Sequence, residues 1–284
     1  AEPSMRGAAG PLHRGDYLLL STMPDPLALG RAARHFFEPQ VEVTDEIRRL
    51  ALSLTANATN DRDKVRALYH WVTQNIRYVS VSLGAGRLVP RSASTVLDTR
   101  YGDCKDHVVL LESLLLAVGI PSSPALISSG SDHRLPSIGA HYPIDHVITY
   151  VPSLDLYLDA TDPFSPFGTL PWSDLDKPVI LTRLDRLGRT PPMRAQEHTS
   201  RTQVRMIITP QGSIQGSAHT RKTGYLESRS RRSRFEDSSR AMDDVVRSQL
   251  FRFNETGTGT LHFTDPSDIT QPYEIRSEFT SSRW

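Results

Sequence analysis

Residues 99–121 read TRYGDCKDHVVLLESLLLAVGIP and contain Cys104, the only cysteine in a chain of 284 residues. Apolar side chains follow the cysteine at the three- and four-residue spacing of a helix face, at Val108, Leu111, Leu115 and Val118. A glycine followed by Ile-Pro then ends the pattern, as is typical of a helix stop. The sequence therefore predicts a largely buried helix over about 104–118, with its lone cysteine in the first turn.

The start of a helix is a favourable place for a thiolate. The first amides of a helix have no partner inside it, and the helix dipole adds about half a positive charge there. Cysteines at such positions can have pKa values of about 3.5–7.5, and the same amides can hold an oxyanion. Most free cysteines are instead small buried hydrophobes. Here GDCKD surrounds Cys104 with a glycine and three charged residues, so we predict a reactive thiol, with Gly102 keeping the approach to the sulfur open.

A nucleophilic thiolate needs a base, and the base needs a group that orients it. DHVITYV (145–151) and LYLDA (156–160) are predicted as two strands joined by PSLD, which is rich in turn formers. If residues 152–155 form the loop, Val151 pairs with Leu156. His146 and Asp159 then lie on the same face as diagonal neighbours, which a slip of one residue would prevent.

The candidate base is therefore His146 and the candidate orienting acid is Asp159, with Asp145 and Asp162 as local rivals. A zinc site is an alternative, because Cys104 and His107 lie one helical turn apart and His141 and His146 are possible further ligands. The sequence, however, contains no second closely spaced pair of zinc ligands. We expect His107, His133 and His141 at the surface or at the mouth of a site, and Tyr78 in the core.

The rest of the chain suggests helices after Thr44 and Asn60, which are good capping residues, and strands at 16–22 and 77–83. Residues 24–40, with three prolines, are expected to be irregular, and 163–200 to be a long connection. Beyond 200 the pattern becomes strand-like with a helical insert at about 225–250, in which RSRRSRF (229–235) is interpreted as a solvated face.

Composition excludes several classes of function. The chain has 33 basic and 32 acidic residues, so it lacks the charge excess of a protein that binds nucleic acid or an anionic membrane. No apolar run approaches the roughly 18 residues of a membrane-spanning helix, and no signal peptide is visible. The chain begins and ends in strand-like sequence, so we expect a fragment of a longer protein.

The stretch IRYVSVSLGAGRLVPRSASTVLDTRYGDCKDHVVLLESLLLAVGIPSSPALIS (76–128), followed by DHVITYV and YLDAT, resembles the transglutaminase-like superfamily. More narrowly, it is similar to a bacterial branch with the motif GDCKD, usually found behind a β-rich domain of unknown function. The resemblance covers roughly residues 40–175. It implies a papain-like fold, with Cys104 as nucleophile, His146 as base and Asp159 as its orienting acid.

The sequence departs from this family pattern in one respect and leaves one role open. Val147 and Ile148 follow the histidine, where many members carry an aromatic residue. No side-chain oxyanion donor is assigned: Gln74 is conceivable by analogy with papain-like proteases, but an exposed helix position is the better interpretation.

We accordingly expect an α+β protein with a papain/transglutaminase-like core and a smaller β-rich C-terminal domain. The expected parts are a lead-in over 1–40, a catalytic domain over 41–175, a linker over 176–200 and the β-rich domain over 201–284. The expected function is acyl transfer or hydrolysis at peptide or protein amide bonds through a thioester, without a cofactor or metal. The alternative is a peptide-binding or interaction module without turnover. Family habit implies a periplasmic or cell-envelope location.

Overall fold

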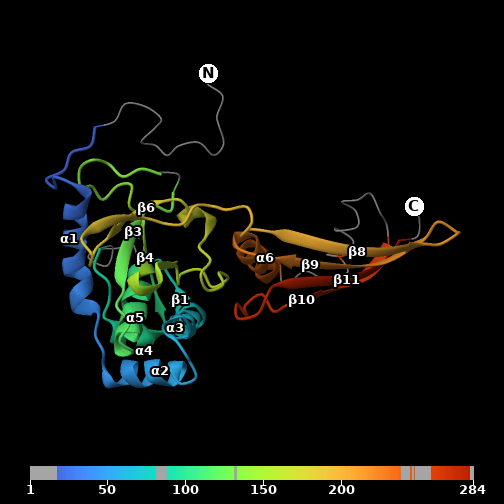
Figure 1. Ribbon diagram of the computed structural model, residues 1–284, viewed down its shortest axis with the longest axis horizontal. Helices are drawn as coiled ribbons and strands as arrows, with labels where there is room; N and C mark the ends of the chain where they lie inside the picture. The colour runs from blue at the N-terminus through green and yellow to red at the C-terminus, as the bar shows by residue number, and fades with distance from the viewer. Residues whose placement is uncertain are drawn as a thin grey trace. The chain divides into compact units, whose positions relative to one another are not determined.

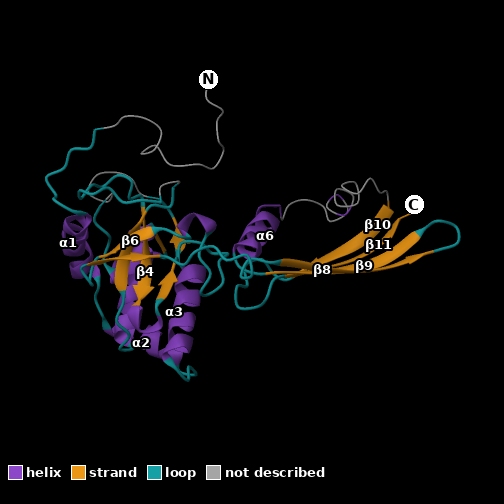
Figure 2. Cartoon of the chain, turned by 45° about the horizontal axis from the view of Figure 1, so that its top comes forward, coloured by secondary structure: helices purple, strands orange, loops and turns teal. Residues whose placement is uncertain are grey.

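The computed structural model describes residues 18–80, 88–130, 133–237, 244, 246 and 257–281. The chain divides into two compact units, one of Ala1–Pro163 with Phe167–Met193 and one of Phe164–Pro166 with Arg194–Trp284. Helices and a sheet are combined in the first unit, while the second is mostly sheet (Figures 1 and 2). The expected α+β class with a β-rich C-terminal region is confirmed.

The first unit is built on a five-stranded sheet in which every neighbouring pair is antiparallel. Across the sheet the order is β5 (Leu156–Leu158), β4 (His146–Val151), β3 (Ser123–Ile127), β6 (Pro178–Leu181) and β7 (Arg186–Arg189). All residues of β3 and all but the first residue of β4 are buried, as expected for strands at the centre of a covered sheet.

The predicted register of the β4–β5 hairpin is confirmed, because Val151 pairs with Leu156. The four loop residues form a short 3₁₀ turn, η4 (Pro152–Leu154), and Asp155 in the left-handed conformation at φ 45°. The ladder extends to the pair Thr149–Leu158, so Asp159 follows directly after the last paired residue of β5.

The cysteine helix α5 (Cys104–Ala117) is the central helix of the first unit (Figure 1). It contacts β4 as well as α2 (Asp45–Thr55), α3 (Asp61–Asn75) and α4 (Ala93–Thr99). Every residue from Lys105 to Leu115 is buried. The predicted apolar stripe therefore underestimates how completely this helix is enclosed. Because it has neighbours on all sides, its position is fixed by packing.

Helices α2 and α3 begin at the predicted capping residues. The Thr44 hydroxyl accepts a hydrogen bond from the Ile47 amide at 3.3 Å, and the Asn60 side chain accepts one from the Asp63 amide at 2.9 Å. These bonds satisfy amides that have no partner within the helix.

Two sequence expectations near the N-terminus are wrong. Residues 24–40 are not irregular, because they contain α1 (Pro26–Phe37) and the 3₁₀ turn η2 (Glu38–Gln40). Asp25 caps α1, and Pro26 occupies a first-turn position where the missing N–H costs nothing. Residues 18–22 form no strand; residues 16 and 17 of that prediction lie outside the described residues.

The expected linker over 176–200 is also corrected, because it contains β6 and β7 of the main sheet. Pro178 is the first residue of β6, a position where a proline is tolerated, and β7 lies at the sheet edge. The predicted strand at 77–83 is short: β1 (Arg77–Tyr78) pairs in parallel with β2 (Tyr101–Gly102), and residues 81–83 lie outside the described residues.

The second unit contains a four-stranded antiparallel sheet and a helix. The sheet order is β10 (Gly257–Phe263), β11 (Glu274–Ser281), β9 (Ile214–Lys222) and β8 (Ser200–Ile208). The helix α6 (Tyr225–Glu236) includes the basic run, but Arg231 is fully buried and pairs with Glu227 at 2.8 Å. Its guanidinium also donates to the carbonyls of Asp265 and Asp268, so the interpretation as a solvated face is wrong at this residue. None of the helices in the described ranges is long and apolar enough to cross a bilayer.

Gly102 has a different role from the one expected. A Cβ atom at this position would lie 2.5 Å from the Asp106 Cβ and 3.2 Å from the Arg91 guanidinium, so the glycine permits close packing at the helix start. The crowded neighbours belong to Asp106 and Arg91, and the sulfur of Cys104 is not among them.

We predict that Gly102→Ala lowers the free energy of unfolding by about 1–3 kcal/mol, because the added methyl group overpacks buried, hydrogen-bonded neighbours. Urea denaturation measures this change. Gly130→Ala is the control, since its new Cβ would meet neighbours at an ordinary 3.7 Å. An unchanged denaturation midpoint for Gly102→Ala would contradict the packing argument.

Candidate active site

The motif GDCKD fixes the first turn of α5 through a reciprocal capping box. The Asp103 carboxylate accepts hydrogen bonds from the amides of Lys105 (3.1 Å) and Asp106 (3.4 Å). In return, the Asp106 carboxylate accepts one from the Asp103 amide at 3.3 Å. Because the Lys105 and Asp106 amides are used for capping, the Cys104 amide is the remaining backbone donor of this turn among the described residues. The expected oxyanion site therefore has fewer backbone donors than the sequence suggested.

The charged residues of the motif are buried and paired. Lys105 donates to Asp103 at 2.5 Å, and Arg91 lies 2.9 Å from Asp106. The Arg91 amide also donates to the Asp106 carboxylate at 2.8 Å. The three charged residues of the motif thus anchor the turn that carries Cys104.

Cys104 itself is partly exposed, in contrast to the residues that follow it. It lines a pocket of about 1020 Å³ together with His146 and Tyr78. Tyr78 is 44% exposed, so the expectation of a core tyrosine is wrong. Burial raises the pKa of the Tyr78 hydroxyl, and the nearby sulfur of Cys104 raises it further. The thiol is therefore accessible from a pocket large enough for a substrate.

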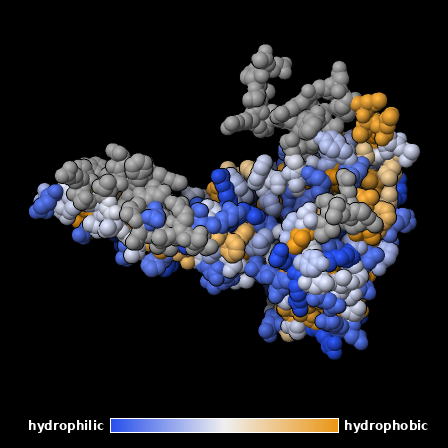
Figure 3. All heavy atoms as spheres, turned by 180° about the vertical axis from the view of Figure 1, so that it is seen from behind, coloured by the Kyte–Doolittle hydropathy of each residue, from blue (hydrophilic) through white to orange (hydrophobic). Residues whose placement is uncertain are grey.

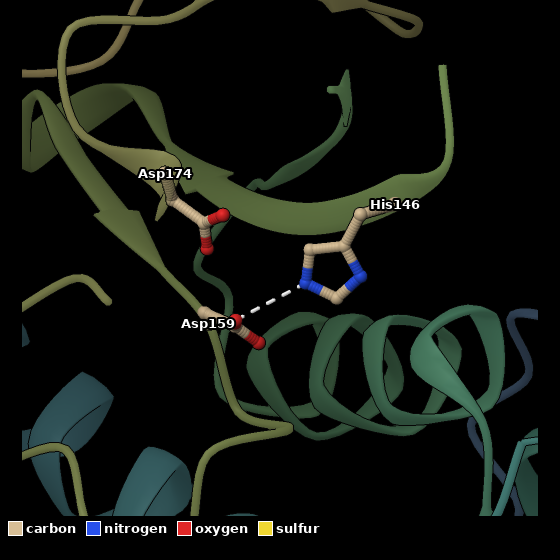
Figure 4. A group of neighbouring side chains, drawn as sticks. All are labelled: His146, Asp159 and Asp174. Atoms are coloured by element: carbon tan, nitrogen blue, oxygen red, sulfur yellow. Dashed lines mark hydrogen bonds and ion pairs between the residues drawn. The ribbon is translucent and has the colours of Figure 1, made fainter. Parts of the chain in front are cut away.

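His146 connects the sulfur to the acid predicted as its partner. Its ring Nε2 lies 3.1 Å from the Asp159 Oδ2 (Figure 4). The side chain of Cys104 lines the same pocket and lies close enough to the imidazole to raise its pKa. Residues from α5, from the first position of β4 and from the end of β5 therefore meet at one place. The structure brings all three predicted site residues together.

Asp159 is held in place by its own neighbours. Its Oδ1 accepts hydrogen bonds from the Thr161 amide (2.9 Å) and the Thr161 hydroxyl (2.6 Å), while Oδ2 faces His146. The backbone carbonyl of Asp159 accepts a bond from the Tyr69 hydroxyl of α3. These contacts leave the carboxylate one orientation, with one oxygen directed at the imidazole.

The electrostatics of the pair favour an imidazolium beside a carboxylate. Burial opposes charge on His146, but the carboxylate of Asp159 and the sulfur of Cys104 outweigh it and raise its pKa well above the usual range. Burial likewise opposes ionisation of Asp159, yet His146 and the two Thr161 bonds hold its pKa well below the usual range. Both partners are charged at neutral pH.

The other sequence candidates lie elsewhere or have other partners. Asp145 accepts a hydrogen bond from the Ser129 amide at 2.7 Å, and Asp162 is buried. Gln74 is exposed, as expected, and donates to the Pro163 carbonyl.

Two of the three remaining histidines lie where the sequence placed them. His133 is exposed and His141 lines the pocket. His107 is instead buried, with its ring nitrogens 2.8 Å and 3.1 Å from the carbonyls of Asp103 and Ile76. Because these contacts occupy both nitrogens, His107 is not available to a metal. Within the described ranges, the predicted zinc set of Cys104 and His107 does not assemble.

Sequence reasoning missed Asp174, which lies beside the pair (Figure 4). The ligand atoms of His146, Asp159 and Asp174 all lie within 4.8 Å of one another. Burial, followed by the charge of Asp159, raises the pKa of Asp174 to about 7. This residue ends η5 (Trp172–Asp174), within the segment expected to be a plain connection, so no strand or helix pattern indicated it.

Comparison with known proteins relates part of the chain to one superfamily. Residues 48–127, from α2 to the end of β3, match the Transglutaminase-like superfamily. The matched segment contains the cysteine helix, while His146 and Asp159 follow it in the chain. No curated protein matches the sequence.

Two solved structures are similar to this chain. A candidate protease from Parabacteroides distasonis is 13% identical with a TM-score of 0.47, over 92% of this chain and 54% of its own. A candidate cysteine protease from Cytophaga hutchinsonii is 22% identical with a TM-score of 0.32, over 44% of this chain and 42% of its own. The chain thus spans about half the length of these relatives.

The geometry predicts that His146 assists the reaction of Cys104 with electrophiles. With a single cysteine, labelling by iodoacetamide reports on this residue alone. We expect His146→Ala to slow alkylation at pH 6 by about tenfold or more, because an unassisted thiol is hardly ionised there. The rates of the two proteins should converge at alkaline pH. Equal rates at pH 6 would contradict the thiolate–imidazolium pair.

Proposed function

We propose that this chain cleaves or transfers acyl groups at peptide or protein amide bonds through a thioester on Cys104. The observation that carries this proposal is the proximity of three groups: Cys104 and His146 line one pocket, and the His146 imidazole lies 3.1 Å from the Asp159 carboxylate. The match of residues 48–127 to the transglutaminase-like superfamily supports the same chemistry. Fold likeness alone would not be sufficient, because one fold can host several activities.

In the first half-reaction, the Cys104 thiolate attacks the amide carbonyl and forms a tetrahedral oxyanion. The His146 imidazolium then gives its proton to the leaving nitrogen, the C–N bond breaks, and ammonia or an amine departs. The acyl group remains on sulfur as a thioester. The Cys104 amide, at the start of α5, is placed to donate to the oxyanion.

In the second half-reaction, the neutral His146 accepts a proton from the incoming nucleophile, which attacks the thioester carbonyl. The C–S bond breaks, and the thiolate–imidazolium pair is restored. Water as acceptor gives an amidase or peptidase, and a primary amine gives a transglutaminase. Asp159 stabilises the imidazolium in both halves, since its carboxylate stays 3.1 Å from the ring.

The pocket beside Cys104 is suited to an apolar side chain of the substrate. Its lining includes Leu29, Ala33 and Phe36 of α1 together with Leu20. Hydrophobic side chains gather on the side of the first unit that carries α1 (Figure 3). We infer that the substrate places an apolar residue against α1 while its reacting amide reaches the sulfur.

The direct test is incubation with a library of glutamine-containing peptides, with and without a primary amine. We expect release of ammonia or a peptide fragment from the wild type and no release from Cys104→Ala. Incorporation of the amine identifies a transglutaminase, and its exclusion a hydrolase. Normal alkylation of Cys104 without any turnover across the library would instead favour a binding module with the same fold.

A second prediction concerns the α1 side of the pocket. Phe36 is 40% exposed, so Phe36→Asp should preserve the fold while placing a charge where an apolar group binds. We expect the KM for peptides with an apolar residue beside the reacting amide to rise about tenfold.

Alkylation of Cys104 by iodoacetamide should not change in Phe36→Asp, because that reagent does not use the apolar pocket. Leu52→Asp on α2 is the matched control: Leu52 is 54% exposed and does not line the pocket. Equal KM values for both variants would contradict the assignment of α1 to substrate binding.

A further inference from the structure

The two oxygens of the Asp174 carboxyl group differ in their hydrogen bonding. Its Oδ1 accepts hydrogen bonds from the hydroxyls of Ser129 (2.5 Å) and Ser173 (3.2 Å). Its Oδ2 is buried and has no donor among the described residues. The residue is only 1% exposed, so bulk solvent does not reach this oxygen.

The Oδ2 atom of Asp174 lies close to the Asp159 carboxylate, which is already negatively charged. Asp174 points toward the His146 ring and the Asp159 carboxylate (Figure 4). All three ligand atoms lie within 4.8 Å of one another. Two ionised carboxylates this close, away from water, repel each other strongly, and a proton on one of them converts the repulsion into a hydrogen bond.

The backbone around Asp174 prevents the side chain from avoiding this contact. The Thr190 hydroxyl donates to the Asp174 carbonyl at 2.5 Å, and the Asp174 amide donates to the Pro171 carbonyl at 3.0 Å. These bonds hold the backbone of Asp174, and the hydroxyls of Ser129 and Ser173 hold its side chain. The carboxyl group is therefore fixed in place beside Asp159.

We propose that Asp174 is a positioning residue that keeps a proton on Oδ2 and donates it in a hydrogen bond to the Asp159 carboxylate. Thr161 would then hold Oδ1 of Asp159. His146, at Oδ2, and Asp174 would hold the rest of the carboxylate. This role rests on the proposed function, because it acts on Cys104 through Asp159 and His146.

Burial and the charge of Asp159 favour a neutral acid at Asp174, whereas the His146 imidazolium opposes it. Asp159 and His146 face Asp174 from the end of β5 and from β4, and burial together with Asp159 outweighs His146 and raises the pKa of Asp174 to about 7. On the β3 side, Asp145 is bound to the Ser129 amide. On its own segment, the Lys177 ammonium donates to the Gly130 carbonyl. As pH rises through about 7, Asp174 is expected to lose its proton and the hydrogen bond to Asp159.

Two variants of Asp174 test whether the residue acts as a hydrogen-bond donor or as a negatively charged carboxylate. Asparagine has the same shape: its oxygen can accept from Ser129 and Ser173, and its NH₂ can donate to Asp159. Alanine removes the donor. We expect Asp174→Ala to slow alkylation of Cys104 at pH 6 by about tenfold, the order seen for partners that orient a reacting group, and Asp174→Asn to restore the rate.

Infrared spectroscopy observes the proton independently of activity. At pH 6 the wild type should show the carbonyl stretch of a protonated carboxylic acid, and this band should be missing in Asp174→Asn. The band should disappear from the wild type as pH rises through about 7. Asp176→Asn is the control, since it removes a nearby exposed carboxylate whose pKa is lowered by its bond with Arg189. This control should keep the band.

An asparagine variant as slow as alanine, or an unchanged infrared band, would overturn the proposal. So would a metal ion at one equivalent in the wild type that is absent from Asp174→Asn, because an ion between the three residues would replace the proton. Failure of the proposed function gives a different result: alkylation would then be insensitive to His146→Ala while the Asp174 band is still present.

Discussion

The reciprocal bonds between Asp103 and Asp106 are the constraint on which the site depends, since they determine the residue at which α5 begins. A start one residue earlier or later would rotate the cysteine by about 100° around the helix axis. Arg91 and Lys105 neutralise the two carboxylates and hold this turn within the buried core. The sulfur can thus be partly exposed while its immediate neighbours are enclosed.

The candidate site combines one helix terminus with two strand ends. Packing of α5 against β4 places Cys104 near His146, and the hairpin between β4 and β5 places Asp159 behind the ring. Each element is held by a large buried area, so the small polar contacts at the site need only adjust orientation. Asp174 joins this arrangement from η5, and its carboxyl group accepts a hydrogen bond from Ser129, which follows β3 in the chain.

Much of this arrangement could be predicted from the sequence because the signals are local. Helix α5 has its cap, its apolar period and its stop within residues 103–119, and the hairpin register follows from a four-residue loop. The prolines of 24–40 were misleading because proline is common both in loops and in first turns of helices. Asp174 could not be found, since its partners Ser129 and Asp159 are distant in sequence and its own segment has no periodic pattern.

The β4–β5 loop has a consequence for how this protein tolerates insertions and deletions. Loops are usually the parts of a protein that change length most freely. Here the four residues between Val151 and Leu156 determine which side chain of the second strand faces His146. One extra residue that shifts the register would turn Asp159 to the opposite side of the sheet, together with the buried side chains of Tyr157 and Leu158. In this short turn, chain length is therefore under the same constraint as the identity of the side chains at the candidate site.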